Sequence, residues 1–164
     1  MKARSLSILI RAFVLGIVAV LLFFKTKKTK KIQKKLENFT FTGFELFFDN
    51  FLNRTFDTDF IGLKADKNKI LYFNNHKGKI NIEFEIIEEE QQKLAEKLHE
   101  YAKEKGYKVT KLTYQRKTNF NPNLDAKVLQ IKTNLNKNKV VSTAKDIFIN
   151  VFNCNENTTF DMLI

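Results

Sequence analysis

Hydrophobic residues dominate one stretch near the start of the chain, residues 6–24, which reads LSILIRAFVLGIVAVLLFF. As a helix rising about 1.5 Å per residue it would span roughly 28 Å, close to the ~30 Å hydrocarbon core of a bilayer. Its one charged side chain, Arg11, lies near enough to the N-terminal end to reach the membrane interface. The pattern predicts a transmembrane helix over residues 6–24, preceded by a short tail, residues 1–5.

A cleaved signal peptide is the main alternative for this stretch, because Lys2 and Arg4 could form its basic n-region. Against cleavage, the apolar run ends in the bulky residues 21–24, and no small-x-small site precedes Lys25. A helix buried in a soluble core is a further alternative, but apart from Arg11 the stretch is apolar on all sides. We therefore expect an uncleaved, single-pass signal-anchor.

After residue 38 the pattern changes to that of a folded domain. Residues 42–52 place phenylalanines at i, i+3, i+4 and i+7, which is one face of a short helix, and Thr42 with Glu45 fits a capping box at its start. Such a stripe either packs on a core or at the membrane interface, or contacts a partner helix. It therefore enters the set of possible interaction residues: Phe44, Phe47, Phe48 and Phe51.

Alternation of apolar and polar residues predicts two strands, 69–74 and 80–87, joined by a polar turn that ends in Gly78. In the second strand, isoleucine and phenylalanine alternate with asparagine and glutamate, which is typical of a strand with one buried and one wetted face. Residues 88–105 predict the clearest helix, since glutamates open it, lysines close it and Gly106 follows at the C′ position.

Four more elements are predicted in the second half of the chain. They are strands at 107–114 and 126–133, a helix at 138–152 with Asn138 as N-cap, and a last strand at 158–164. The loop between the first two contains a turn signal, NPN at 121–123. Because long loops often carry recognition, three of its residues join the possible interaction set: Arg116, Lys117 and Phe120.

These elements predict one α+β domain over residues 39–164, in which an antiparallel sheet carries two helices on one face, as a two-layer sandwich. From about residue 79 the order is β-α-β-β-α-β, which resembles the order of ferredoxin-like sandwiches. One conflict stays open, because the strands at 69–74 and 158–164 compete for the same place beside the strand at 80–87. The resemblance is one of element order and implies no function.

The net charge of +11 is concentrated at the N-terminal end. Residues 1–35 hold ten basic residues and no acid, whereas residues 36–164 hold 19 basic and 18 acidic residues. A near-neutral domain argues against nucleic acid as a partner. The Lys-rich juxtamembrane segment 25–38 would contact anionic lipid and favours a cytoplasmic domain. These membrane-surface residues are Lys25, Lys27, Lys28, Lys30, Lys31, Lys34 and Lys35.

The sequence offers no motif for catalysis or metal binding. His76 and His99 have no neighbours with the spacing of a zinc site. A calcium-loop-like run opens at Asp57 but lacks the ligands at its fifth and twelfth positions. Cys154 is the one cysteine and has no positioned histidine beside it in sequence. We therefore expect no cofactor, no metal and no catalytic residue.

The function expected from this pattern is that of a non-enzymatic protein-binding subunit or adaptor, held at the bilayer by residues 6–24. Two alternatives stay open. In one, the same architecture places the domain outside the cytoplasm, as a subunit of an envelope complex. In the other, the domain binds a small ligand or is an enzyme whose site is assembled from scattered polar residues.

Overall fold

The computed structural model describes residues 38–116 and 124–164. The predicted transmembrane helix and all seven membrane-surface lysines lie outside these residues. None of the described helices is both long and apolar enough to cross a bilayer. The described elements are η1 (Phe41–Gly43), α2 (Phe44–Leu52), β1 (Phe60–Lys64), β2 (Ile70–His76), β3 (Lys79–Ile86), α3 (Glu89–Glu104), β4 (Lys108–Arg116), β5 (Leu124–Leu135), α4 (Lys137–Asp146), η2 (Ile147–Val151) and β6 (Asp161–Leu163).

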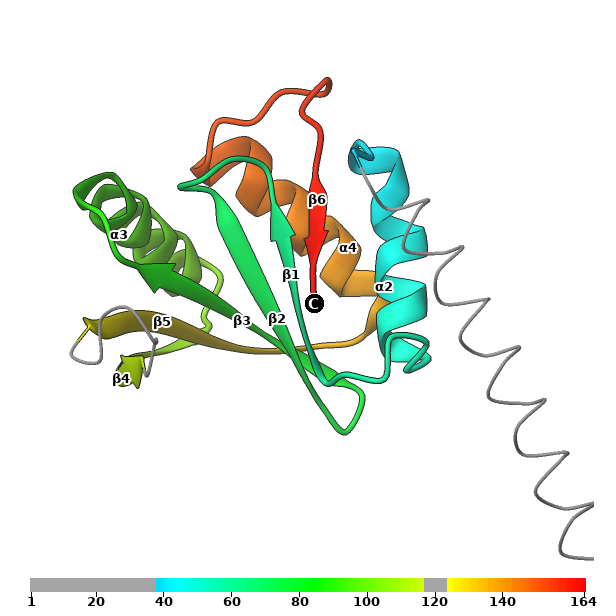
Figure 1. Cartoon of the computed structure of the whole chain (residues 1–164), viewed down its shortest axis with the longest axis horizontal. Helices are drawn as coiled ribbons and strands as arrows, with labels where there is room; N and C mark the ends of the chain where they lie inside the picture. Colours follow the sequence, from blue (N-terminus) through cyan, green and yellow to red (C-terminus); the bar gives the residue numbers. More distant parts are fainter. Residues whose placement is uncertain (1–37, 117–123) are drawn as a thin grey trace, which may run out of the picture. The chain divides into compact units, whose positions relative to one another are not determined.

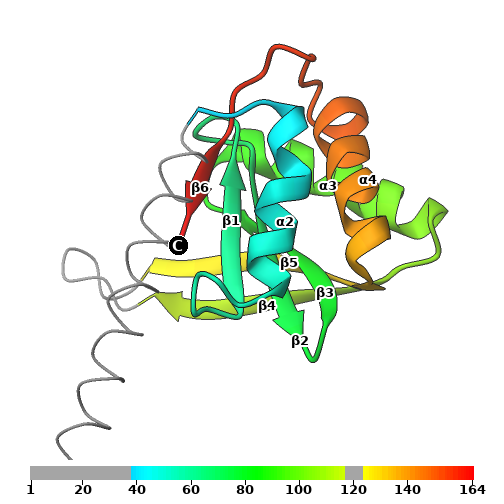
Figure 2. The same cartoon turned by 90° about the vertical axis from the view of Figure 1, so that its right-hand side faces the viewer.

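The described domain has an α+β fold, as predicted. Six antiparallel strands form one sheet in the order β4-β5-β3-β2-β1-β6, and α2, α3 and α4 cover one face of it (Figures 1 and 2). Alternation decides which side chains meet the helices: in β3, Ile80, Ile82 and Phe84 are fully buried between sheet and helices. The third helix of this layer is α2, the short helix predicted from the phenylalanine stripe.

The predicted element order from Lys79 onward is confirmed, but the strand pairing differs from that of a ferredoxin-like sandwich. Both competing strands belong to the sheet, and β2 is the one that lies beside β3. The last strand, β6, pairs instead with β1 at the far edge. β1 was missing from the sequence prediction, and its presence gives the C-terminal strand a place of its own.

A two-residue turn explains why β2 takes the place beside β3. Lys77 and Gly78 have φ angles of 52° and 78°. Two successive residues with positive φ form the turn whose twist matches a tight antiparallel hairpin. Because this closure is local, it costs less entropy than bringing in a strand from the far end of the chain.

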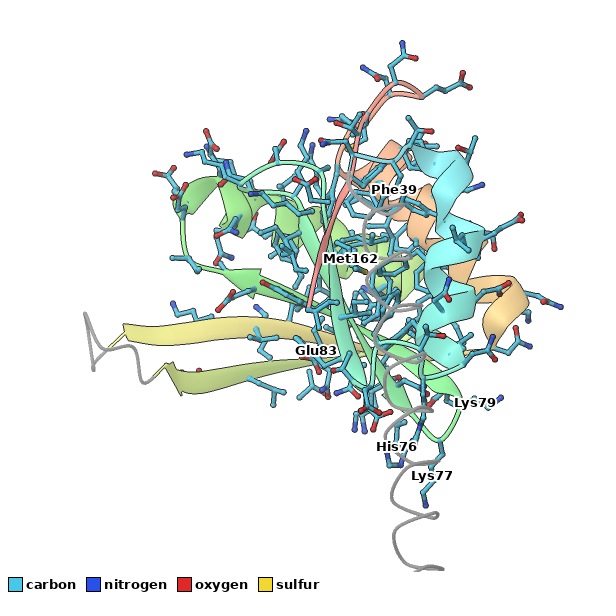
Figure 3. The ribbon with its side chains drawn as sticks, turned by 45° about the vertical axis from the view of Figure 1, so that its right-hand side comes forward. Phe39, His76, Lys77, Lys79, Glu83 and Met162 are labelled. Carbon is cyan, nitrogen blue, oxygen red and sulfur yellow. The ribbon has the colours of Figure 1, made fainter. Side chains whose placement is uncertain are left out.

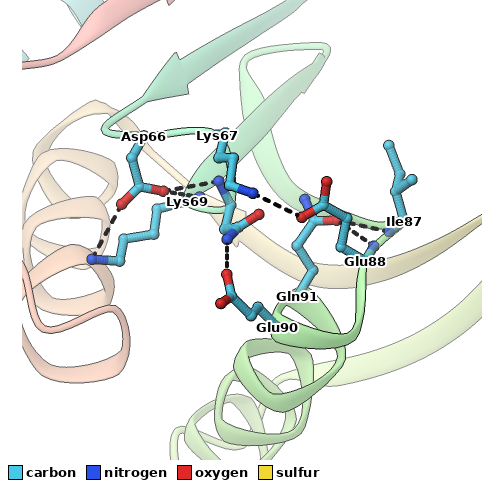
Figure 4. A network of polar contacts seen from close by, with 8 residues as sticks. Asp66, Lys67, Lys69, Ile87, Glu88, Glu90 and Gln91 are labelled. Carbon is cyan, nitrogen blue, oxygen red and sulfur yellow. Dashed lines mark hydrogen bonds and ion pairs between the residues drawn. The ribbon is translucent and has the colours of Figure 1, made fainter.

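Helix α3 begins at an N-cap residue, Glu88, and ends before Gly106, as the sequence predicted to within a residue. The side chain of Gln91 accepts hydrogen bonds from the backbone N–H groups of Ile87 and Glu88 at 2.8 and 2.9 Å, which satisfies donors left unpaired at a helix start. Lys67, in the β1–β2 turn, forms an ion pair of 3.3 Å with Glu88 (Figure 4). Gly106 has a φ of 72°, which confirms the C′ glycine.

The capping box predicted at Thr42 and Glu45 is not formed. The chain makes a 3-10 turn over Phe41–Gly43, and α2 starts at Phe44 with Gly43 as N-cap. The Thr42 hydroxyl lies 3.1 Å from the hydroxyl of Thr40 instead. The tight turn before α2 replaces the extended N-cap residue that a capping box requires.

Helices α3 and α4 are also joined by a polar bridge. The Tyr101 hydroxyl donates to Asp146 Oδ2 at 2.7 Å, and Lys105 Nζ lies 3.4 Å from the same oxygen. Burial by itself would raise the pKa of Asp146, but hydrogen bonds from Tyr101 and Asn150 and the charge of Lys105 outweigh it and hold that pKa below its ordinary value. Desolvation, with the hydrogen bond to Asp146, raises the pKa of Tyr101. The bridge fixes how the two helices lie on the sheet.

Phenylalanine rings fill the core between the sheet and the α2–α4 pair. Phe44 lies 4.9 Å from Phe160 and 6.0 Å from Phe148, and Phe48 lies 4.8 Å from Phe73, as ring centroid distances in edge-on arrangements. We call this group the phenylalanine cluster; its members are Phe39, Phe41, Phe44, Phe47, Phe48, Phe73, Phe148 and Phe160.

Candidate functional site

The β4–β5 hairpin extends away from the rest of the sheet (Figure 3). Both of its strands are longer than the sequence predicted, at Lys108–Arg116 and Leu124–Leu135 against 107–114 and 126–133. The β2–β3 turn with His76, Lys77 and Lys79 lies elsewhere in the molecule, away from the protruding end of the hairpin (Figure 3). The hairpin therefore exposes a length of sheet that the helices do not fully cover.

A cleft of about 380 Å³ lies between the middle of α3 and the hairpin. We call it the α3 cleft. Its volume falls in the range of sites that bind small molecules. It is lined by Ile86, Gln92, Ala95, Glu96, His99, Lys111, Leu112, Thr113, Lys127, Val128 and Leu129.

The α3 side of the cleft follows from helical spacing. Gln92, Ala95, Glu96 and His99 stand at i, i+3, i+4 and i+7, so they share one face of α3. Ala95 is 4% exposed and leaves room because its side chain is a single methyl group. Gln92 Nε2 donates to Glu96 Oε1 at 3.2 Å, which links two polar groups on the same rim.

The sheet side of the cleft follows from strand register. Lys127 of β5 pairs with Thr113 of β4 and with Ile86 of β3, so the three residues form one row across the sheet. Lys111 pairs with Leu129 in the next row on the same face. The cleft therefore has an apolar floor with two lysines standing on it.

Four lysines give one part of the hairpin, residues 108–113 and 127–132, a positive charge. Lys108 and Lys132 are paired directly across the strands, and Lys111 and Lys127 are diagonal neighbours on the cleft side. Residues 108–113 and 127–132 contain no acidic residue. All four lysines are exposed, and none has an ion-pair partner among the residues that the structure describes. Like charges directly opposite each other destabilise an antiparallel pair, so this arrangement has a cost that an anionic ligand would offset.

The possible interaction residues of the sequence analysis fall into two groups. The phenylalanine stripe of α2 is fully buried, with Phe44, Phe47, Phe48 and Phe51 at 0% exposure, so these rings are core residues and form no surface for a partner. Arg116 is the last residue of β4, and only its backbone is described. Lys117 and Phe120 lie outside the described residues.

The other residues examined for chemistry are dispersed. His76 is exposed at the β2–β3 turn, and His99 is exposed on α3, in the cleft. Cys154 is buried, and burial raises the pKa of its thiol, so the neutral form prevails. The calcium-loop-like run breaks up because Ile61 and Gly62 belong to β1. Among the described residues, no group of three histidine, cysteine or carboxylate side chains could hold a metal ion.

Sequence reasoning missed the cleft and the hairpin lysines. The spacing of Lys108, Lys111, Lys127 and Lys132 on two predicted neighbouring strands, without an acid among them, was the available signal. It was obscured because lysine is abundant throughout the chain.

Comparison with known proteins adds no assignment to this geometry: no protein-family model, no curated protein and no solved structure matches the chain.

Proposed function

We propose that this chain is a single-pass membrane-anchored protein whose α+β domain is a non-enzymatic protein-binding module. The α3 cleft is its binding surface, and the domain faces the cytoplasm. The observation that carries the binding role is the α3 cleft itself, an apolar floor with uncompensated lysines beside an exposed strand. The anchor rests on the apolar stretch 6–24 and the lysines that follow it.

The geometry favours binding over catalysis for a chemical reason. Catalytic nucleophile–base pairs are typically recognised by the hydrogen bond that joins them and by a third group that orients the base. In the cleft, the hydrogen bond from Gln92 to Glu96 is between exposed side chains on one helix. Lysines on an apolar floor instead suit a ligand that carries both apolar and anionic groups.

Membrane fractionation tests the anchor. We expect the full-length chain to stay in the membrane pellet after alkaline carbonate washing, and a chain lacking residues 1–35 to appear in the supernatant, because an apolar helix leaves lipid far less readily than a surface-bound domain. A tag placed after Ile164 should be accessible from the cytoplasmic side. Release of the full-length chain by carbonate would contradict the anchor, and a tag accessible from the opposite side would favour the envelope-subunit alternative.

Site-specific photo-crosslinking in intact membranes tests the binding surface. A photo-reactive residue at Thr113, in the cleft, should give discrete cross-linked protein bands that the double variant Lys111→Glu/Lys127→Glu reduces at least about tenfold. The matched control is the same residue at Glu156, which is exposed in the loop before β6. Specific binding in the cleft would be contradicted by bands of equal intensity from Thr113 and Glu156. It would also be contradicted by bands whose intensity the charge reversal leaves unchanged.

A further inference from the structure

We propose that the partner presents an extended acidic segment that adds to the free edge of β4 as a further strand of the sheet. This inference rests on the proposed function, since it names the chemistry and the conformation of the ligand for the same site.

β4 lies at an open edge of the described sheet. In the described sheet, β5 pairs with one side of β4 and no strand pairs with the other. β4 runs for nine residues, whereas the strand at the opposite edge, β6, has three. In an antiparallel pair, every second residue turns its backbone N–H and C=O away from its neighbour. β4 therefore presents a row of such groups long enough to bind a peptide by main-chain hydrogen bonds.

The lysines of β4 favour an acidic strand beside it. A strand beside β4 would run past Lys108 on the outer face of the sheet and past Lys111 on the cleft face. Both side chains are exposed and lack an ion-pair partner among the described residues. Carboxylates at the facing positions would form charge-assisted hydrogen bonds with them. A second copy of β4 would instead bring lysine against lysine, which is how edge lysines prevent self-association.

The order of side chains along β4 predicts a sequence pattern for the ligand strand. Lys108 and Lys111 are separated by Val109, which faces the helices, and Thr110, which faces away, and Leu112 follows on the outer face. Directly opposite positions in an antiparallel ligand would then be apolar, acidic, polar, apolar and acidic. The pattern VETVE satisfies all five positions, with its two acids three residues apart and on opposite faces.

The test measures binding of synthetic peptides to the full-length chain in mild detergent, by fluorescence anisotropy. The probe is the labelled peptide TTVETVETT. One control replaces both glutamates by lysine, and a second keeps the acids but N-methylates the amides that would face β4. We expect each control to bind at least about tenfold more weakly than the probe. Amide hydrogen exchange should slow in β4 when the probe binds, and should stay unchanged in β6.

Protein variants complete the test. Lys108→Glu/Lys111→Glu should lower the affinity for the acidic probe at least about tenfold and raise the affinity for the lysine peptide. The matched control, Lys79→Glu/Lys97→Glu, makes the same charge change at exposed lysines outside the cleft and the hairpin, and should leave both affinities unchanged.

Three outcomes would overturn strand addition. Equal binding of the N-methylated peptide would show that charge alone holds the ligand. Exchange protection confined to α3 would place the ligand over the cleft without pairing to β4. Binding of phosphatidylserine vesicles that Lys108→Glu/Lys111→Glu weakens, with no binding of the probe, would assign these two lysines to lipid. If cross-linking at Thr113 persists while strand addition fails, the protein-binding role stands without it; loss of that cross-linking defeats the proposed function itself.

Discussion

Phe44→Ala should lower the free energy of unfolding of the domain by about 3–5 kcal/mol, the range for removing a buried phenylalanine ring. Phe44 is fully buried, and its ring centroid lies within about 6 Å of those of Phe41, Phe148 and Phe160. These neighbours come from η1, η2 and the residue just before β6. The cavity left by the ring is therefore walled by three separate segments, which cannot all close on it together.

Urea unfolding of the full-length chain, followed by circular dichroism, measures this loss. Because small domains are stable by only about 5–15 kcal/mol, the midpoint should move far enough to leave part of the variant unfolded at low urea. Phe60→Ala is the matched control, since Phe60 lies on the open face of the sheet and is 42% exposed; we expect it to cost less than about 1 kcal/mol. Equal losses for the two variants would mean that the phenylalanine cluster is not the core.

The contrast between Phe44 and Phe60 shows what the sequence could predict. Helical spacing identified the α2 stripe, and alternation identified β2 and β3, because these patterns depend on near neighbours along the chain. Spacing alone could not decide whether the stripe is core or contact surface. That question depends on which elements pack against it, and the answer came from Phe148 and Phe160, more than 100 residues away.

The sequence analysis did not predict strand β1, and the reason is a glycine in the middle of the strand. Its central residue, Gly62, is of a type that weakens strands and marks turns. In the structure, a Cβ at this position would lie 3.0 Å from ring atoms of Tyr72 and 3.1 Å from Leu163. The glycine therefore serves the close approach of neighbouring side chains from β2 and β6. A residue type that indicates a break in sequence is here a packing requirement of the sheet.

The candidate site could not be predicted from the sequence for a related reason. The α3 cleft combines one face of a helix with rows from three strands, and its rows exist only through the register of β3, β5 and β4. The sequence prediction placed recognition in the loop after β4, at Arg116, Lys117 and Phe120. The structure instead favours the strands as the recognition surface. There Lys108 and Lys132 lie opposite each other, and neither has a counter-ion among the described residues.

Gly43→Ala should destabilise the domain by about 1–3 kcal/mol, the usual cost of overpacking. Backbone conformation alone would predict that the variant is more stable. Gly43 has φ −80° and ψ −10°, a conformation that alanine adopts without strain. Alanine also lowers the conformational entropy of the unfolded chain, which stabilises the fold by about 0.4–1 kcal/mol. Close packing against Phe39 instead makes the variant less stable. A Cβ on Gly43 would lie 2.9 and 3.0 Å from Cγ and Cβ of Phe39, and nearer still to its ring atom Cδ2.

Phe39 cannot yield cheaply, because its ring packs on Phe47 and Phe160 and its backbone pairs with that of Phe160. A double-mutant cycle with Phe39→Ala isolates this contact. Phe39→Ala removes the two ring contacts and keeps only the contact to Cβ at 3.0 Å. In that background Gly43→Ala should therefore cost clearly less than in the native chain, and the two changes should couple by about 1–3 kcal/mol. Urea midpoints of the four proteins give the coupling directly. Additive losses would show that Gly43 is required for the turn into α2 and not for the space that Phe39 occupies.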